Sequence, residues 1–223
     1  MDPSAFTLAA VTDDLGDEPR ARDHADLLEF RMDLATDPVA AIRDYSGVLP
    51  ILATNRVTDE GGEAPPADAR LARLEAAVDL APVTAVDIEA ATLRTDRGAA
   101  LARHAREAGV TVVASTHDFE STPDAATLED RLARTARIGD IGKVAVTATD
   151  LDDALTLLTA THRATTAGQD VATVAMGEYG RHTRIVAPVY GSRIAYAPFD
   201  ADGATAPGQY DLATMAGLLA AVR

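Results

Sequence analysis

Short apolar runs alternate along this chain with longer segments of helical periodicity. The runs are rich in β-branched residues, and several are apolar at nearly every position, as in strands of a sheet that is covered on both faces. We predict eight strands, which span residues 5–11, 27–33, 48–54, 83–89, 110–115, 142–147, 171–176 and 194–198.

Amphipathic segments separate most of these runs, and they cover residues 65–81, 91–109, 122–139, 149–168 and 210–223. In the first of them, Leu71, Leu74 and Val78 recur at the spacing of one helix face. Gly109 is placed to end the second segment in the left-handed conformation. The dipeptide at 122–123 is Thr-Pro, which predicts a cap followed by proline in the first helical turn.

The alternation of eight strands with helices predicts an α/β fold, namely a single-domain (β/α)8 TIM barrel over residues 1–223. A doubly wound open sheet is the alternative. The first strand leads into AAVTDD at residues 9–14, which lacks the glycine-rich phosphate loop of a dinucleotide fold. No internal repeat or linker divides the chain.

The amino-acid composition excludes several classes of site and of protein. The 223 residues include no cysteine, so a disulfide framework, a thiolate metal site and a cysteine nucleophile are excluded. No apolar run approaches the roughly 18 residues of a membrane span. The first residues lack the basic start and apolar core of a secretory signal. We therefore expect a cytoplasmic protein without membrane contact.

The formal net charge is −15, which disfavours binding to nucleic acid because like charges repel. Of the 20 basic residues, Lys143 is the only lysine. A GC-rich genome accounts for arginine in place of lysine but not for the acidic excess. We therefore expect the protein of a halophile, whose surface stays hydrated through carboxylates.

Polar residues gather near the carboxyl ends of the predicted strands, where barrels of this kind carry their reacting groups. Glu29, Arg31 and Asp33 alternate on one strand, and Asp87 and Glu89 alternate on another. The third strand runs into Arg56, and His117 follows the fifth strand. The alternatives are a solvated strand face, a loop cation and a packed histidine. No two histidines have the spacing of metal ligands.

Lys143 lies within an apolar strand. Burial penalises the charged amine, and a neutral amine can attack a ketone and form a Schiff base. His117, at the end of the neighbouring strand, has a suitable ordinary pKa for moving a proton next to the iminium, and Glu89 could orient its ring. The alternative is a buried cation that is paired with a carboxylate.

With these residues in place, the chain resembles the type I 3-dehydroquinate dehydratases of the shikimate pathway. The matching stretches run in family order along the chain. They are EFRMD (29–33), TNRVTDEGG (54–62), VDIE (86–89), STHDFESTP (115–123), DIGKVAV (140–146), MGEYGRHTR (176–184), VYGS (189–192) and APGQ (206–209).

The resemblance implies a (β/α)8 barrel that dehydrates 3-dehydroquinate to 3-dehydroshikimate without a cofactor or a metal. It implies that Lys143 forms the imine, that His117 is the general acid and base, and that Glu89 orients His117. Asp33 and Asp87 would support the arginines. The implied substrate-binding residues are Glu29, Arg31, Arg56, Met176, Arg184, Tyr196, Thr205 and Gln209, the last two on a loop that closes as a lid.

Two departures from the family concern the site. Thr205 stands where serine is usual, and Tyr196 stands where phenylalanine is usual, so its extra hydroxyl needs a partner. A class I aldolase on the same fold, and a non-catalytic relative that binds a ligand, are the alternative functions. The family resemblance also implies a possible homodimer.

Overall fold

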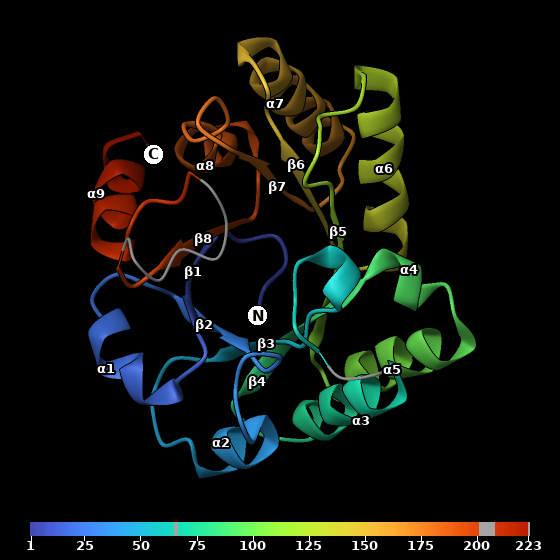
Figure 1. Ribbon diagram of the computed structural model, residues 1–223, viewed down its shortest axis with the longest axis vertical. Helices are drawn as coiled ribbons and strands as arrows, with labels where there is room; N and C mark the ends of the chain where they lie inside the picture. Colours follow the sequence, from blue (N-terminus) through green and yellow to red (C-terminus); the bar gives the residue numbers. More distant parts are fainter. Residues whose placement is uncertain (65–66, 201–207, 223) are drawn as a thin grey trace.

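The computed structural model describes residues 1–64, 67–200 and 208–222, and its centre is a barrel of parallel strands. Helices surround the strands in chain order (Figure 1). The strands are β1 (Thr7–Thr12), β2 (Leu27–Arg31), β3 (Ile51–Thr54), β4 (Val83–Glu89), β5 (Thr111–His117), β6 (Ile141–Thr147), β7 (Val171–Met176) and β8 (Ile194–Pro198). They confirm the predicted (β/α)8 barrel.

The sheet runs in the order β7-β6-β5-β4-β3-β2-β1-β8, with parallel pairing throughout. The barrel closes between its two ends at the start of β7 and β8. There the backbone N–H of Arg193 donates to the carbonyl of Val171 at 2.7 Å. The N–H of Thr173 donates to the hydroxyl of Ser192 at 3.0 Å. These contacts join β7 to β8, and the pairing of β1 with β8 brings the first and last thirds of the chain together.

Each strand is followed by helical structure that covers its outer face. The elements are η1 (Leu15–Asp17), α1 (Glu18–Ala21), α2 (Pro38–Asp44), η2 (Thr58–Glu60), α3 (Ala67–Val78), α4 (Ala90–Leu93), α5 (Asp96–Glu107), α6 (Ala125–Ile138), α7 (Leu151–Thr166), α8 (Thr183–Val186), η3 (Ala187–Tyr190) and α9 (Leu212–Val222). Among the described residues, no helix is both long enough and apolar enough to span a membrane.

Two predicted helix starts are corrected. The segment 91–109 is divided, because the Thr95 side chain accepts from the N–H of Gly98 and caps a new helix, α5. Helix α6 is capped by Asp124, which accepts from the N–H of Thr127, and not by Thr122. The Thr122 hydroxyl donates instead to the carbonyl of Thr147. Gly109 has φ of +77°, as predicted for a left-handed helix end.

Five strands, β1, β2, β3, β5 and β6, differ in their limits from the prediction, and one of these differences concerns the site. Strand β3 begins at Ile51, because the N–H groups of Val48 and Leu49 donate to the Glu18 carboxylate and not to a strand. Strand β5 extends to His117, so this histidine lies on the strand itself.

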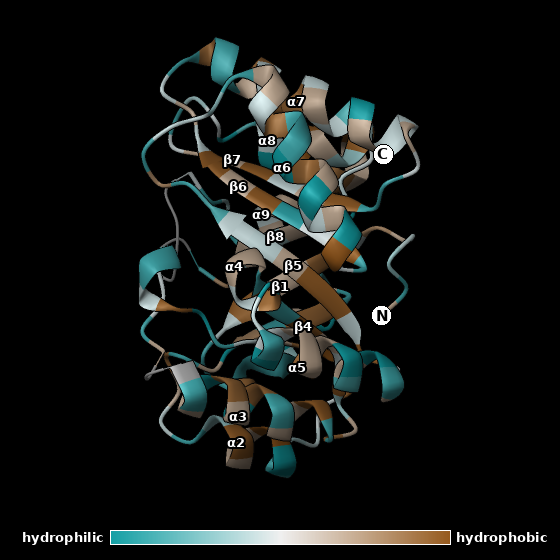
Figure 2. Cartoon of the chain, turned by 90° about the vertical axis from the view of Figure 1, so that its right-hand side faces the viewer, coloured by the Kyte–Doolittle hydropathy of each residue, from teal (hydrophilic) through white to brown (hydrophobic). Residues whose placement is uncertain are grey.

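Side chains on each strand alternate between the barrel interior and the layer beneath the helices. The outward-facing set includes Leu28, Phe30 and Met32, which are fully buried against the helices. In Figure 2 the strands are largely hydrophobic, and the helices carry both hydrophobic and hydrophilic positions. The lower interior is an apolar layer that includes Leu27, Leu52, Ala85, Ile141 and Ala172. Two residues further along three of these strands, the interior carries the charged residues Glu29, Asp87 and Lys143.

Candidate active site

Most of the predicted site residues converge at the carboxyl ends of the strands. One cavity is lined by Glu29, Arg31, Arg56, His117, Lys143, Met176, Arg184, Tyr196 and Gln209. Glu89 lies beneath this cavity, 1% exposed, and is not part of its lining. Thr205 falls outside the described residues.

Lys143 extends from β6 into the barrel, and its side chain is only 8% exposed. Its Nζ donates to Asp87 Oδ2 at 3.0 Å and lies 3.7 Å from Glu29 Oε1. The amine is therefore buried and paired with a carboxylate, which is the alternative that the sequence left open. The flanking residue Val144 faces the outer layer with α6 and α7, whereas position 143 faces the charged interior.

Ion pairs extend from Lys143 across the barrel floor. Arg56 donates to Asp87 Oδ1 at 2.8 Å and to Glu89 Oε1 at 3.0 Å. Arg70, from α3, reaches the other oxygen of Glu89 at 2.7 Å. The charges thus alternate in sign from Arg70 to Lys143, and each buried charge has an opposite neighbour, as burial requires.

The network fixes the charge of its central members. Burial works against the charged form of Asp87, but Arg56 and Lys143 outweigh it and hold the pKa of Asp87 well below its ordinary value. Burial likewise opposes the charge of Arg56, yet Asp87 and Glu89 raise the pKa of Arg56 above its ordinary value. Ser115 completes the cluster by donating to Asp87 Oδ1 at 2.5 Å. Asp87 is therefore a permanent anion beside Lys143.

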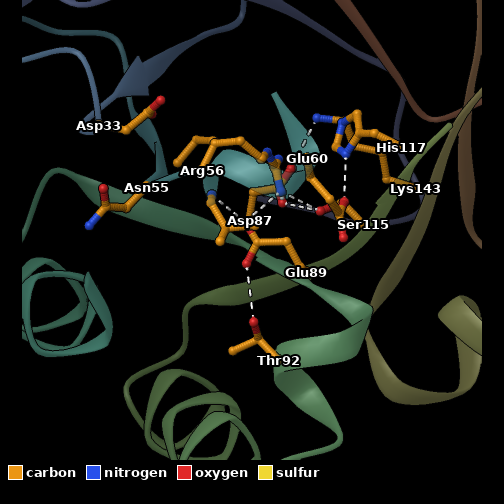
Figure 3. A network of polar contacts seen from close by, with 12 residues as sticks. Asp33, Asn55, Arg56, Glu60, Asp87, Glu89, Thr92, Ser115, His117 and Lys143 are labelled. Carbon is orange, nitrogen blue, oxygen red and sulfur yellow. Dashed lines mark hydrogen bonds and ion pairs between the residues drawn. The ribbon is translucent and has the colours of Figure 1, made fainter. Parts of the chain in front are cut away.

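His117 is oriented by Glu60 and not by Glu89. Its Nδ1 lies 2.8 Å from Glu60 Oε2. The oxygens of Glu89 accept from Arg56, Arg70, the Thr92 hydroxyl and the N–H of Val57. Figure 3 shows Glu89 directed towards Thr92, away from the histidine. The expected pair of Glu89 with His117 is thus corrected, because the loop after β3 brings a different carboxylate to the ring.

The Glu60–His117 pair lies in surroundings that oppose charge. Burial, followed by the positive charges of Arg56 and Lys143, lowers the pKa of His117 well below its ordinary value. Burial raises the pKa of Glu60 to about 7, although Arg56 opposes this shift. The imidazole is therefore neutral near neutral pH. When Glu60 is ionised, it accepts a hydrogen bond from the N–H at Nδ1. This leaves Nε2 unprotonated, as the basic nitrogen of the ring.

A glycine contact holds the loop that carries Glu60. Gly61 follows the 3-10 turn η2 and has φ of +80°, a conformation that suits glycine. A Cβ at this position would lie 2.5 Å from the ring of Phe119. Phe119 also stacks on His117, with ring centroids 6.1 Å apart. The histidine and its carboxylate partner are thus held by one packed unit.

The arginines of the site occupy different environments. Arg31 makes a two-point contact with Asp33, at 2.9 Å and 2.6 Å, which confirms the expected support by this aspartate. Asp87 supports Arg56 through a single ion pair at 2.8 Å. Arg184 lies on α8 and is 4% exposed, and burial lowers its pKa to about 10. An anion bound beside Arg184 would stabilise this buried charge.

Three contributors were not found by sequence reasoning: Glu60, Arg70 and Ser115. Glu60 was detectable in principle, because it belongs to the loop that follows a strand at the active end of the barrel. Arg70 has the periodicity of an ordinary helical surface residue, and Ser115 that of a strand interior. Their roles depend on contacts with residues 19 and 28 positions away.

The barrel, with a buried lysine, a histidine and arginines at the carboxyl ends of its strands, defines an enzyme of the (β/α)8 class. A sequence model described as Type I 3-dehydroquinase matches residues 6–223. The chain therefore belongs to the type I 3-dehydroquinase family, and it is a lyase of the hydro-lyase kind.

Relatives and solved structures agree with this family. The chain is 55% identical over 223 residues to 3-dehydroquinate dehydratase of Haloarcula marismortui, covering 98% of this chain and 97% of the relative. It is 48% identical to that of Halobacterium salinarum, covering 99% of both. The crystal structure of the Geobacillus kaustophilus enzyme matches with a TM-score of 0.87 and 30% identity, over 98% of this chain and 91% of that one. The two haloarchaeal relatives support the expected halophilic origin.

Proposed function

We propose that this chain dehydrates 3-dehydroquinate to 3-dehydroshikimate through a Schiff base on Lys143, with His117 as the general acid and base. The observation that carries this proposal is the burial of Lys143 in the same cavity as His117 and Arg184. Family membership makes a dehydratase the best supported reaction, in preference to an aldolase or a non-catalytic binding protein.

The first step is attack of Lys143 Nζ on the ring ketone. The amine is hydrogen bonded to Asp87, and it passes one proton to His117 as the substrate arrives, which frees its electron pair for attack. After addition, the oxygen leaves as water and an iminium remains. The anions Asp87 and Glu29 lie beside this nitrogen and stabilise the positive charge of the iminium.

The second step is removal of a proton from the carbon next to the iminium. Neutral His117 accepts this proton at Nε2, while Glu60 holds the ring through Nδ1 and stabilises the imidazolium that forms. The electron pair of the broken C–H bond forms an enamine, which expels the hydroxyl from the carbon β to the iminium carbon. His117 returns its proton to this hydroxyl, which leaves as water. Hydrolysis of the imine then releases the product.

Substrate binding is assigned to the charged rim of the cavity. Arg184 would pair with the substrate carboxylate, because a guanidinium forms charge-assisted hydrogen bonds with a carboxylate. Glu29, Arg31 and Arg56 would contact the ring hydroxyls, and Met176 supplies an apolar wall. Gln209 lines the cavity and would close over the substrate, with Thr205 proposed beside it.

Borohydride reduction in the presence of 3-dehydroquinate, followed by peptide mass analysis, tests the proposal. We expect a ligand adduct on the peptide that contains Lys143. Lys143→Ala should form no adduct and have no turnover, whereas His117→Ala should form the adduct and stall. An adduct on another peptide, or turnover by Lys143→Ala, would contradict the proposed function. A homodimer stays a prediction, and sedimentation equilibrium would test it.

A further inference from the structure

Tyr196 lies next to the amine of Lys143 in the barrel interior. It belongs to β8, pairs in register with Ala9 of β1 and is 6% exposed. Its side chain lines the cavity, and the centre of its ring is 4.0 Å from Lys143 Nζ. A substrate that is covalently bound to Nζ would therefore lie against this side chain.

The Tyr196 hydroxyl is buried and has no hydrogen-bond partner among the residues that the structure describes. Burial, followed by the negative charges of Glu29 and Asp87, raises the pKa of this phenol well above its ordinary value. The group is therefore a permanent donor without an acceptor. Tyr45 provides a contrast, because its hydroxyl donates to the carbonyl of Leu49 at 2.8 Å. A buried donor without an acceptor costs stability, and such groups in folded proteins commonly mark function.

We propose that the Tyr196 hydroxyl donates a hydrogen bond to the substrate oxygen on the carbon that Lys143 attacks. This inference rests on the proposed Schiff-base function. That oxygen is two bonds from Nζ in the adduct, so it is brought to the same side chain that contacts the amine. It would supply the acceptor that the described residues do not supply.

The hydrogen bond would act while the carbonyl oxygen carries charge. As the Nζ electron pair forms the bond to carbon, the π electrons of the ketone move to oxygen, which becomes an alkoxide. The Tyr196 hydroxyl stabilises this alkoxide and keeps its own proton. A proton then passes from nitrogen to oxygen to give the carbinolamine. The proton that His117 took from the amine then converts the oxygen to water, which leaves as the iminium forms.

The two parts of Tyr196 can be separated by mutation. The ring face lies against Nζ and favours the ammonium and the iminium through a cation–π contact. Tyr196→Phe keeps this ring and removes only the hydroxyl. It should therefore slow the addition step while leaving the later proton removal by His117 unchanged.

The test compares Tyr196→Phe with wild type and with Tyr45→Phe as the matched control. Borohydride trapping of 3-dehydroquinate under single-turnover conditions gives the rate of adduct formation, and thermal unfolding gives stability. We expect adduct formation to be at least about tenfold slower in Tyr196→Phe, which is the typical effect of losing one hydrogen bond to a developing charge. Its unfolding temperature should be unchanged or higher, since no hydrogen bond to a described residue is lost.

The control should show the opposite pattern. Tyr45→Phe removes a hydrogen bond to Leu49, so it should lower the unfolding temperature and leave trapping unchanged. Equal trapping rates for Tyr196→Phe and wild type would overturn the inference, even if KM rises, because the hydroxyl would then contact another substrate oxygen. Slower trapping with a lower unfolding temperature would also overturn it, by indicating a structural role. Failure of the wild type itself to form an adduct would refute the proposed function.

Discussion

Glu60 and Glu89 are both carboxylates near His117, the proposed general base, and replacing each with glutamine separates their roles. Each substitution removes one negative charge with little change in volume. Glu60 contacts His117 at 2.8 Å, whereas Glu89 pairs with Arg56 and Arg70. We expect Glu60→Gln to affect catalysis and Glu89→Gln to affect stability.

The expected magnitudes follow from the contacts. The Glu60 side chain is 16% exposed, and its removal should change the free energy of unfolding by about 1 kcal/mol or less. Loss of the carboxylate that supports the general base should lower kcat by at least about tenfold. Glu89 is 1% exposed between two arginines, and breaking a buried pair costs about 3–5 kcal/mol. For a chain of this length, that loss lowers Tm by roughly 10 °C.

The pH dependence gives a second readout. The active form has Glu60 ionised, and its pKa is raised to about 7, so activity should rise as pH increases through about 7. Below this pH, protonated Glu60 donates to Nδ1 and leaves the proton of the imidazole on Nε2, where the base is needed. The pKa of His117 lies well below its ordinary value, so protonation of this histidine does not cause the loss of activity below about pH 7, the acidic limb of the pH profile. Glu60→Gln should remove the limb near pH 7.

The assay is the appearance of the conjugated enone from 3-dehydroquinate between pH 5 and pH 9, together with thermal unfolding of each variant. Wild type and Glu89→Gln should share the same limb, measured below the unfolding temperature of the variant. The reasoning is refuted if Glu60→Gln keeps the wild-type profile, or if Glu89→Gln loses turnover while its Tm stays unchanged.

Three further predictions concern the loop, the surface and the anion site. Gly61→Ala should lower both stability and kcat, because it adds a left-handed strain of about 1–2 kcal/mol and a contact with Phe119. Gly109→Ala, with φ of +77° and open space around it, should lower stability alone; equal kinetic effects would contradict this reasoning. Added potassium chloride should raise the urea midpoint, because it screens the net charge of −15; an unchanged midpoint would count against a halophilic surface. Arg184→Met should raise KM for 3-dehydroquinate at least tenfold, about 1.4 kcal/mol, without preventing borohydride trapping at saturating substrate.

Much of the architecture was predictable from local patterns. Eight short apolar runs with helical segments between them predicted the barrel, since strand and helix periodicities are local properties of the chain. The burial of the single lysine was also predictable from local pattern, because its neighbours in sequence are apolar. The alternation of side chains also placed Glu29 and Arg31 on one interior face.

The partners of these residues were decided only by the closed barrel. Glu60 lies 57 positions from His117, and Asp87 lies 56 positions from Lys143. Which carboxylate reaches the imidazole depends on the course of the loop after β3. Sequence reasoning chose Glu89 because it ends the strand that precedes the one leading to His117. The sequence by itself determined the strands and the order of their polar ends. Tertiary structure decided which charges meet across the interior, because those distances depend on barrel closure and loop conformation and not on any local period.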